Sequence, residues 1–121
     1  MITMNDLRDV CLGLPEANES FPFGDEAAVY KVSGKIFALI SQDAPDISLK
    51  CDPAFGEVLR MNYEAVKPGY HLDKRHWITV NVDGSVPDDE VIEWIDTSYR
   101  LVIAKMPKAE RERLLRQLDA G

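Results

Sequence analysis

Cysteine is scarce in this chain, which has only Cys11 and Cys51 among its 121 residues. Small domains that depend on disulfides have more cysteines at closer spacing, so we expect both to be buried, reduced thiols in a reducing compartment. Long apolar runs are also lacking, and none approaches the roughly 20 residues that span a bilayer. The N-terminus shows neither the basic stretch nor the apolar run of a signal peptide. We therefore expect a cytoplasmic protein with no membrane role.

Signatures of catalysis and of metal binding are missing as well. The seven glycines are scattered, so there is no glycine-rich phosphate loop. His71 and His76 are the only histidines, and neither has a cysteine or a carboxylate pair at a usual metal-ligand spacing. Cys51 precedes a helix start, where a thiolate would be stabilised, but it also continues the alternation of a strand, which favours a buried structural thiol. We expect no enzyme activity, no cofactor and no metal.

The negative charge of the chain is unevenly distributed. The net charge is −7, and residues 83–96 carry six acids with no base. Residues 67–77 instead carry three bases against one acid, and residues 105–116 carry five bases against two acids. An acidic chain repels polyanions as a whole, so nucleic-acid binding would require a local basic patch.

Four helices are predicted from the spacing of apolar residues and from start and stop signals. The first begins with a capping box at Thr3 and ends near residues 13–15. Asp52-Pro53 starts the second, which runs to about residue 62. The third is predicted over roughly 88–105, with acids in its first turns as the helix dipole prefers, and the fourth over 107–118. Each of these helices is predicted to bury one apolar stripe. In the second helix the stripe is Phe55, Val58 and Leu59. In the third it is Val91, Ile95, Ser98, Tyr99, Val102 and Met106, and Ile92 and Ile103 widen it.

Alternation with a period of two predicts four strands. A hairpin is expected over 28–32 and 35–41 around the turn Ser33-Gly34, a third strand over 47–50 and a fourth over 76–82. In the second strand, Ala38 and Ile40 would share one face and Phe37 the other. Strands with one apolar face need helices to cover it. We therefore predict a single α+β domain over 1–121, a two-layer sandwich with an antiparallel sheet of at least four strands, in the order α-β-β-β-α-β-α-α.

The most concentrated candidate site is the segment 67–77. After the turn Pro68-Gly69 it gathers aromatic rings and cations that together could hold an anion such as a phosphate, because arginine offers a bidentate fork, lysine a point charge and the rings a stacking surface. The predicted site residues are Tyr70, His71, Lys74, Arg75, His76 and Trp77, with Lys50 in support across the sheet. The structural alternative is that Tyr70 and Trp77 close the core and the cations only solvate the loop.

A second segment with aromatic residues is Phe21-Pro22-Phe23-Gly24. Two aromatics around a proline in a loop most often cover a core edge, and a ligand-contacting loop is the alternative.

Several motifs together resemble the MmcQ/YjbR family over nearly the whole chain. They are the 21–24 motif, Ile47-Ser-Leu-Lys-Cys-Asp-Pro53, Pro68-Gly-Tyr-His-Leu-Asp-Lys-Arg-His-Trp77, and Asp83-Gly84 followed by a helix that ends near residues 104–107. The resemblance implies a CyaY-like, that is frataxin-like, α+β fold. It also implies the family's description as predicted DNA-binding proteins with a double-wing motif, and it carries over no catalytic residues.

The leading hypothesis is thus a monomeric binding module that contacts DNA or another phosphate-bearing ligand through the 67–77 loop and Lys50. The alternative is a protein-interaction or small-ligand module with no nucleic-acid role. In that version residues 21–23 and Trp77 form one pocket mouth, and the acidic helix faces a basic partner.

Overall fold

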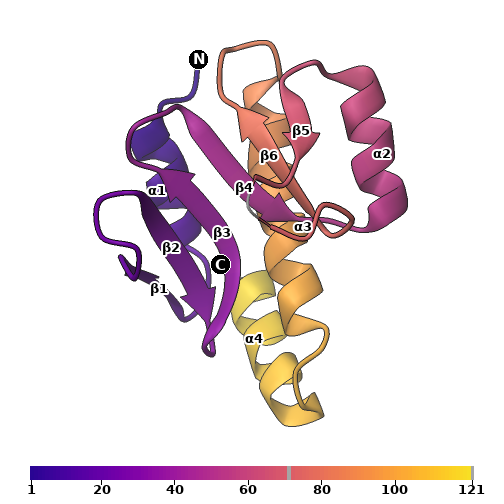
Figure 1. Ribbon diagram of the computed structural model, residues 1–121. Coiled ribbons are helices and arrows are strands. Elements are labelled where there is room, and N and C mark those ends of the chain that lie inside the picture. Colours follow the sequence, from indigo (N-terminus) through magenta and orange to yellow (C-terminus); the bar gives the residue numbers. More distant parts are fainter. Residues whose placement is uncertain (71, 121) are drawn as a thin grey trace.

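The computed structural model describes residues 1–70 and 72–120, and it contains a six-stranded sheet with four helices (Figure 1). The predicted helices and the four predicted strands are all present in the predicted order, joined by two further short strands. In chain order the elements are α1 (Met4–Leu12), β1 (Ala17–Ser20), β2 (Ala27–Val32), β3 (Lys35–Ser41), β4 (Asp46–Lys50), α2 (Pro53–Asn62), β5 (Val66–Pro68), β6 (Trp77–Asn81), α3 (Asp88–Ile103) and α4 (Lys108–Ala120).

The sheet is antiparallel throughout, with the strand order β1-β2-β3-β4-β6-β5. The two strands absent from the sequence prediction, β1 and β5, form its edges. β1 is four residues of mostly polar character and β5 is three residues ending in a proline. Short, polar or proline-bearing edge strands are common because they discourage pairing with another chain, and they give little alternation to read.

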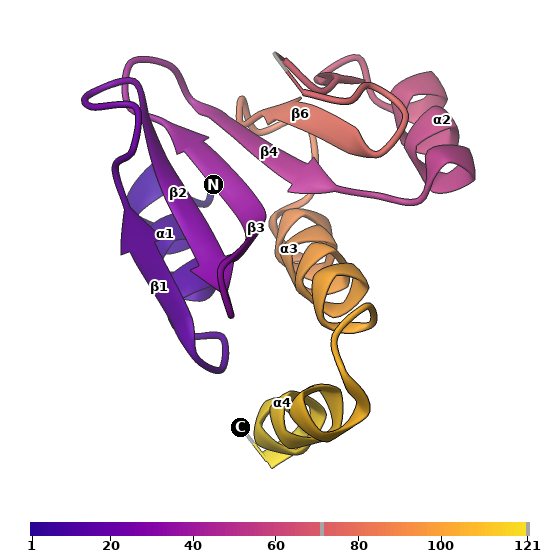
Figure 2. The ribbon, with the colours of Figure 1, turned by 60° about the horizontal axis from the view of Figure 1, so that its bottom comes forward.

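Helices α1 and α3 cover one face of the sheet, and α3 contacts β2, β3 and β4. Figure 2 shows α1 behind β1, β2 and β3, with α3 and α4 following one another below the sheet. A buried serine ties α3 to the sheet: Ser98 Oγ donates to the carbonyl of Phe37 at 2.6 Å and accepts from the backbone N–H of Lys50 at 2.8 Å. The two-layer α+β architecture predicted from the sequence is confirmed, whereas the frataxin-like label remains a prediction.

One strand breaks the predicted alternation. In the β2–β3 ladder Tyr30 pairs with Ala38 and Lys31 with Ile36, so Phe37 is an extra, bulged residue. Phe37 and Ala38 are both fully buried in the core, and the Phe37 ring meets Tyr99 edge-on at 5.3 Å. The prediction that Phe37 lies on the face opposite Ala38 is therefore wrong, because a bulge lets two neighbouring residues point the same way.

The predicted buried stripe of α2 is wrong for two of its three residues. Leu59 is buried, but Phe55 is 38% exposed and Val58 is 50% exposed. These two side chains are exposed because α2 lies at the end of the sheet and contacts β5 and β6 through the side that carries Gly56 and Leu59. A Cβ at Gly56 would lie 2.9 Å from Cys51 Sγ, so the glycine permits this close approach.

Helix α3 follows its predicted stripe with two differences. Ile92 is exposed, contrary to the prediction, whereas Trp94 is buried and was missed. Within residues 1–70 and 72–120, no helix combines the length and the apolar character needed to cross a membrane.

Phe21 and Phe23 are both about half exposed, so the prediction that the 21–24 loop covers a core edge stays a prediction. Cys11 and Cys51 are both buried and free, as predicted.

Candidate functional site

The sheet has an open face, which we define as the face that points away from α1 and α3 and toward the viewer in Figure 1. A row of cross-strand partners marks it, because directly opposite residues share a face. The alternate residues of β4 and β6, which are Ile47, Leu49, Ile78 and Val80, point to the opposite face and are buried beneath the helices. The row consists of Ser20, Val29, Leu39, Ser48, Thr79 and Lys67.

Lys50 and Trp77 lie side by side on this open face. They are directly opposite partners in the β4–β6 ladder, two residues along from Ser48 and Thr79, and both are half-buried. The hydroxyls of Ser48 and Thr79 are 2.8 Å apart, which fixes the register next to them. The sequence prediction that Lys50 lies near the 67–77 segment across the sheet is confirmed.

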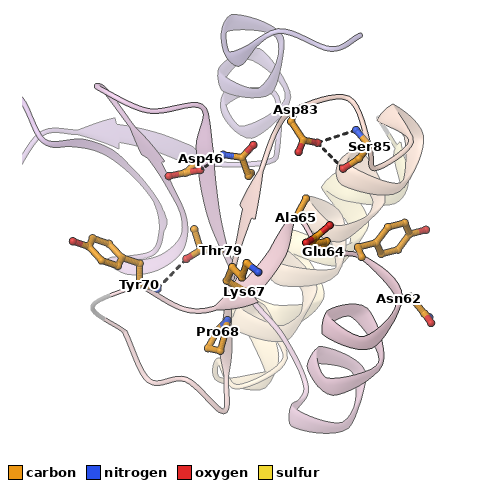
Figure 3. A pocket seen from close by; sticks show the side chains of 12 residues that line it. Asp46, Asn62, Glu64, Ala65, Lys67, Pro68, Tyr70, Thr79, Asp83 and Ser85 are labelled. Carbon is orange, nitrogen blue, oxygen red and sulfur yellow. Dashed lines mark hydrogen bonds between the residues drawn. The ribbon is translucent and has the colours of Figure 1, made fainter.

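The loop between β5 and β6 turns back over the open face. The N–H of Gly69 donates to the carbonyl of Trp77 at 2.9 Å, and the N–H of Tyr70 donates to Thr79 Oγ1 at 2.9 Å. A Cβ at Gly69 would lie 2.6 Å from the Cβ of Trp77, so only glycine fits there. Tyr70 is 69% exposed and its ring extends away from Thr79 and Lys67 (Figure 3). The alternative in which Tyr70 closes the core is thus wrong.

Within this loop, Asp73 organises its neighbours. Its carboxylate accepts from the backbone N–H of Arg75 at 2.9 Å and lies 3.0 Å from Nδ1 of His76. The hydrogen bond from the Arg75 backbone, followed by that of His76, lowers the pKa of Asp73. The ammonium of Lys74 folds back to the carbonyl of Gly69 at 2.9 Å. Asp73 and the Gly69 carbonyl therefore already engage the polar groups of two predicted site residues, His76 and Lys74.

Three cationic groups are available for a ligand. The ammonium groups of Lys50 and Lys67 and the guanidinium of Arg75 make no hydrogen bond or ion pair with any described residue. The open face also presents Lys31, which the sequence prediction did not include; it pairs with Asn18 two residues along from Val29. His71, the remaining predicted site residue, lies outside the described residues.

The other end of the open face is an acidic hollow of about 810 Å³. It is lined by Asp46, Asn62, Tyr63, Glu64, Ala65, Lys67, Pro68, Tyr70, Thr79, Asn81, Asp83 and Ser85 (Figure 3). The lining thus contains three carboxylates, those of Asp46, Glu64 and Asp83, and one lysine, Lys67. The sequence analysis missed this hollow because its acids come from three separate segments of the chain. Only the β4–β6 register brings Asp46 opposite Asn81, whose amide donates to it at 3.1 Å.

Hydrogen bonds hold the rim of the acidic hollow in place. Asp83 accepts from the hydroxyl of Ser85 at 2.5 Å and from its backbone N–H at 2.9 Å. The hydroxyl contact is the larger cause that lowers the pKa of Asp83, so this carboxylate stays charged. The open face is consequently polarised, with cations around Lys50 and Arg75 and carboxylates around Asp46 and Asp83.

Neither thiol has the surroundings of a nucleophile. Burial raises the pKa of Cys11 to about 12, and burial is also the largest cause that raises the pKa of Cys51. Cys51 directly follows β4, not ending it as predicted, but it is buried as predicted, and its N–H donates to the carbonyl of His76 at 2.8 Å. Across the part of the chain that the structure describes, no group of three or more His, Cys, Asp or Glu side chains could hold a metal ion.

Residues 21–23 and Trp77 do not line a common pocket, contrary to the alternative hypothesis drawn from the sequence. Phe21 follows β1 at one edge of the sheet, whereas Trp77 begins β6, and strands β2, β3 and β4 lie between them. The depression beside Phe21 is lined by Gly24, Asp25 and Gln42. This part of the small-ligand alternative is therefore wrong.

The chain is similar to proteins from several bacteria. The model of the family described as YjbR matches residues 12–101, which include the whole 67–77 segment. The uncharacterized protein YjbR of Escherichia coli strain K12 is 35% identical over 119 residues, covering 97% of this chain and 100% of that protein. The uncharacterized protein YbdF of Escherichia coli O157:H7 is 36% identical over 107 residues, covering 87% and 88% respectively.

Solved structures repeat the same fold. The crystal structure of Deinococcus radiodurans protein DR2400 superposes with a TM-score of 0.87 at 44% identity, covering 94% of this chain and 88% of that one. A protein from Pseudomonas syringae superposes with a TM-score of 0.73 at 26% identity, covering 83% and 98%.

Proposed function

The chain belongs to the YjbR family, and we propose, from its own surface, that it is a binding module, not an enzyme, that holds single-stranded nucleic acid on the open face of its sheet. The observation that carries this proposal is the pairing of available cations with aromatic rings on the sheet face that α1 and α3 do not cover, at the end where Lys50 and Trp77 lie, although Val29 and Ser48 farther along that face are buried. Lys50 of β4 is opposite Trp77 of β6. Tyr70 and Arg75, both exposed, come from the loop that joins β5 to β6.

The chemistry of these groups suits a phosphate chain with unstacked bases. Base stacking on an aromatic ring is worth about 1–3 kcal/mol per base, and Arg and Lys side chains neutralise the phosphates between them. Lys67, Trp77 and Lys50 lie on the three adjacent strands β5, β6 and β4. Neighbouring strands are about 4.8 Å apart, and Lys67 is opposite Thr79, two residues along β6 from Trp77. A nucleic-acid strand that crosses them obliquely would therefore meet all three within about 12 Å.

A single strand fits better than a duplex. Duplex readers insert a helix or ribbon into the major groove, and the basic helix of this chain, α4, has two of its arginines engaged. Arg113 forms a two-pronged pair with Glu16 at 2.9 and 3.0 Å, and Arg111 donates to the carbonyl of Met106 at 3.2 Å. The open sheet face presents rings and cations to an extended strand without such a helix.

The acidic surroundings set the expected strength of binding. A net charge of −7 opposes polyanions, so affinity has to come from the local groups and will fall steeply with salt. The carboxylates of the acidic hollow repel phosphates, which would confine the backbone to the end near Lys50 and Arg75. A base could still enter the hollow, because carboxylates accept hydrogen bonds from exocyclic amines.

Fluorescence anisotropy with a labelled single-stranded oligonucleotide, titrated at several salt concentrations, tests the proposal. With contacts from Lys50, Lys67 and Arg75, the slope of log affinity against log salt should be about −2. Arg75→Ala should weaken binding and reduce the slope to about −1.4, whereas Arg116→Ala, the same charge change on exposed α4, should have a smaller effect. Absence of binding at low salt, or equal effects of the two substitutions, would contradict it.

A second candidate function is small-ligand binding in the acidic hollow. Its volume of about 810 Å³ falls in the range of ligand sites, and its excess of carboxylates favours a ligand that bears an amine. Thermal-shift screening with amine-bearing compounds would detect it. A hit lost in Asp46→Asn, from a protein that binds no oligonucleotide, would replace the nucleic-acid proposal with this one.

A further inference from the structure

Helix α2 exposes apolar side chains that its sequence pattern would place in a core. Phe55 and Val58 are 38% and 50% exposed, and Met61 beside them is 85% exposed. Single exposed apolar residues are ordinary, but neighbours on one side of a helix form a patch that marks an interaction surface. This patch lies on the helix at the end of the sheet, so it is separate from the open face (Figure 1).

The patch borders a groove between α2 and α3, which we call the helix groove. Phe55, Val58 and Asn62 line it from α2 at positions i, i+3 and i+7, and a matching stripe lines it from α3. Leu59 and Trp94, each only 5% exposed, form its apolar base. The α3 stripe consists of Glu90, Glu93, Trp94 and Thr97, and the groove encloses about 300 Å³.

One end of the helix groove is braced by aromatic and polar contacts. The hydroxyl of Tyr63 donates to the carboxylate of Glu90, and the rings of Tyr63 and Trp94 meet edge-on at 5.7 Å. These contacts join the C-terminal end of α2 to the N-terminal half of α3. The two walls are therefore held in a fixed relation, and the groove is a preformed feature of the fold.

The two walls differ in chemistry. The α2 wall is apolar through Phe55 and Val58, whereas the α3 wall carries Glu90 and exposed Glu93, and no lysine or arginine is among the groove-lining residues that the structure describes. The exposed acid Asp89 precedes Glu90 in the same helix. An occupant that complements both walls needs an apolar side and a positively charged side.

We propose that the helix groove binds a basic amphipathic helix of another protein. Its apolar residues would pack on Phe55, Val58 and the base at Trp94, and its Lys or Arg side chains would pair with Glu93 and its acidic neighbours. A helix laid between two helices uses residues at the same i, i+3, i+4 spacing that lines this groove. The groove shares Asn62 and Tyr63 with the acidic hollow, but it contains none of the cations Lys50, Lys67 and Arg75 that carry the proposed nucleic-acid function.

Other occupants match the two walls less well. The basic helix of this chain is α4, but its leucines pack into its own core through Leu114, Leu115 and Leu118, so a second copy has no apolar side of α4 to offer. An anionic membrane or a nucleic acid would meet the carboxylates of α3 and be repelled. A basic segment of a partner protein satisfies the apolar wall and the acidic wall together.

The test uses the full chain and a fluorescein-labelled synthetic helix of leucine and lysine, about 18 residues or five turns long. Anisotropy measures its affinity for the wild type and for Val58→Ser and Glu93→Gln, with Phe23→Ser and Glu112→Gln as matched exposed controls elsewhere. We expect each groove substitution to weaken binding about 5- to 10-fold and each control less than about 2-fold. Because Val58 and Glu93 are exposed, all four variants should keep the unfolding midpoint of the wild type.

A second measurement locates the bound helix. Addition of the leucine–lysine helix should slow amide hydrogen exchange in α2 and in the first half of α3, and should leave β1 and β2 unchanged. Three results would overturn the proposal: equal weakening by groove and control substitutions, equal affinity for a leucine–glutamate helix, or self-association of the chain that Val58→Ser abolishes without any binding of the leucine–lysine helix. The last result would assign the groove to a second copy.

Discussion

Lys50 and Trp77 are directly opposite each other in the β4–β6 ladder, on the face of the sheet that α1 and α3 leave uncovered. Opposite residues in an antiparallel pair have Cβ atoms about 4.5–5.5 Å apart, so the two side chains leave the sheet next to each other on the same face. The pair places a cation and a stacking surface within the reach of one nucleotide.

The first prediction concerns this pair. Lys50→Ala should weaken oligonucleotide binding about 3- to 10-fold, because it removes one phosphate contact, and should make the salt slope about 0.7 less steep. Lys108→Ala, an exposed lysine at the start of α4, is the matched control. Equal losses for the two variants, measured by anisotropy, would show that overall charge and not this pair determines binding.

Ser98 provides a test of how the core supports the site. It is fully buried and bonds both the Phe37 carbonyl and the Lys50 N–H, so Ser98→Ala leaves two backbone groups without a partner. The expected loss is about 2–4 kcal/mol in the free energy of unfolding, measured by urea denaturation. Thr97→Ala, one position earlier on α3, should change stability by less than about 0.5 kcal/mol. A Ser98→Ala loss no larger than that of the control would refute the bridging role.

We predict that protonation of Asp73 changes the conformation of the loop between β5 and β6 at low pH. Hydrogen bonds in the folded loop lower the pKa of its carboxylate below the ordinary value of 3.8. A carboxylate with a lowered folded pKa stabilises the folded form above its unfolded pKa, and the contribution is lost as the pH falls through the folded pKa. The amide resonances of Arg75 and His76 should therefore titrate with a midpoint below 3.8. In Asp73→Asn this transition should disappear; a midpoint at or above the ordinary value would contradict the loop geometry.

The reactivity of the two cysteine thiols tests whether either of them could act as a catalytic nucleophile. Burial raises the pKa of both cysteines, to about 12 for Cys11, so neither should be a thiolate at neutral pH. We expect no modification by iodoacetamide in the native protein and modification of both residues in guanidinium chloride, read by mass spectrometry. Rapid native labelling of Cys51 would reinstate it as a candidate nucleophile.

Much of the fold could be read from local signals. The capping box at Thr3 and Asp6 forms as predicted, and Ser33-Gly34 makes the hairpin turn with both residues at positive φ. These features depend on a few neighbouring residues, and the same is true of the Asp52 cap with Pro53 at the start of α2. Local chemistry therefore gave the helices, the hairpin and the loop that carries the candidate site.

The parts that sequence could not give depend on long-range placement. The bulge accompanies the packing of the Phe37 ring on Tyr99 of α3, and the exposure of Phe55 and Val58 follows from the position of α2 at the end of the sheet. The acidic hollow needs the register that brings Asp46 opposite Asn81, which lie 35 residues apart. Spacing along the chain contains no information about such pairings until the strand order is known.

Binding of single-stranded nucleic acid to the open face is tested most directly by mapping a bound oligonucleotide onto the backbone amides by NMR. We expect the largest shifts in β4 near Lys50 and in residues 67–79, with little change in α4. Shifts concentrated in residues 105–116, or no saturable shifts at low salt, would contradict it.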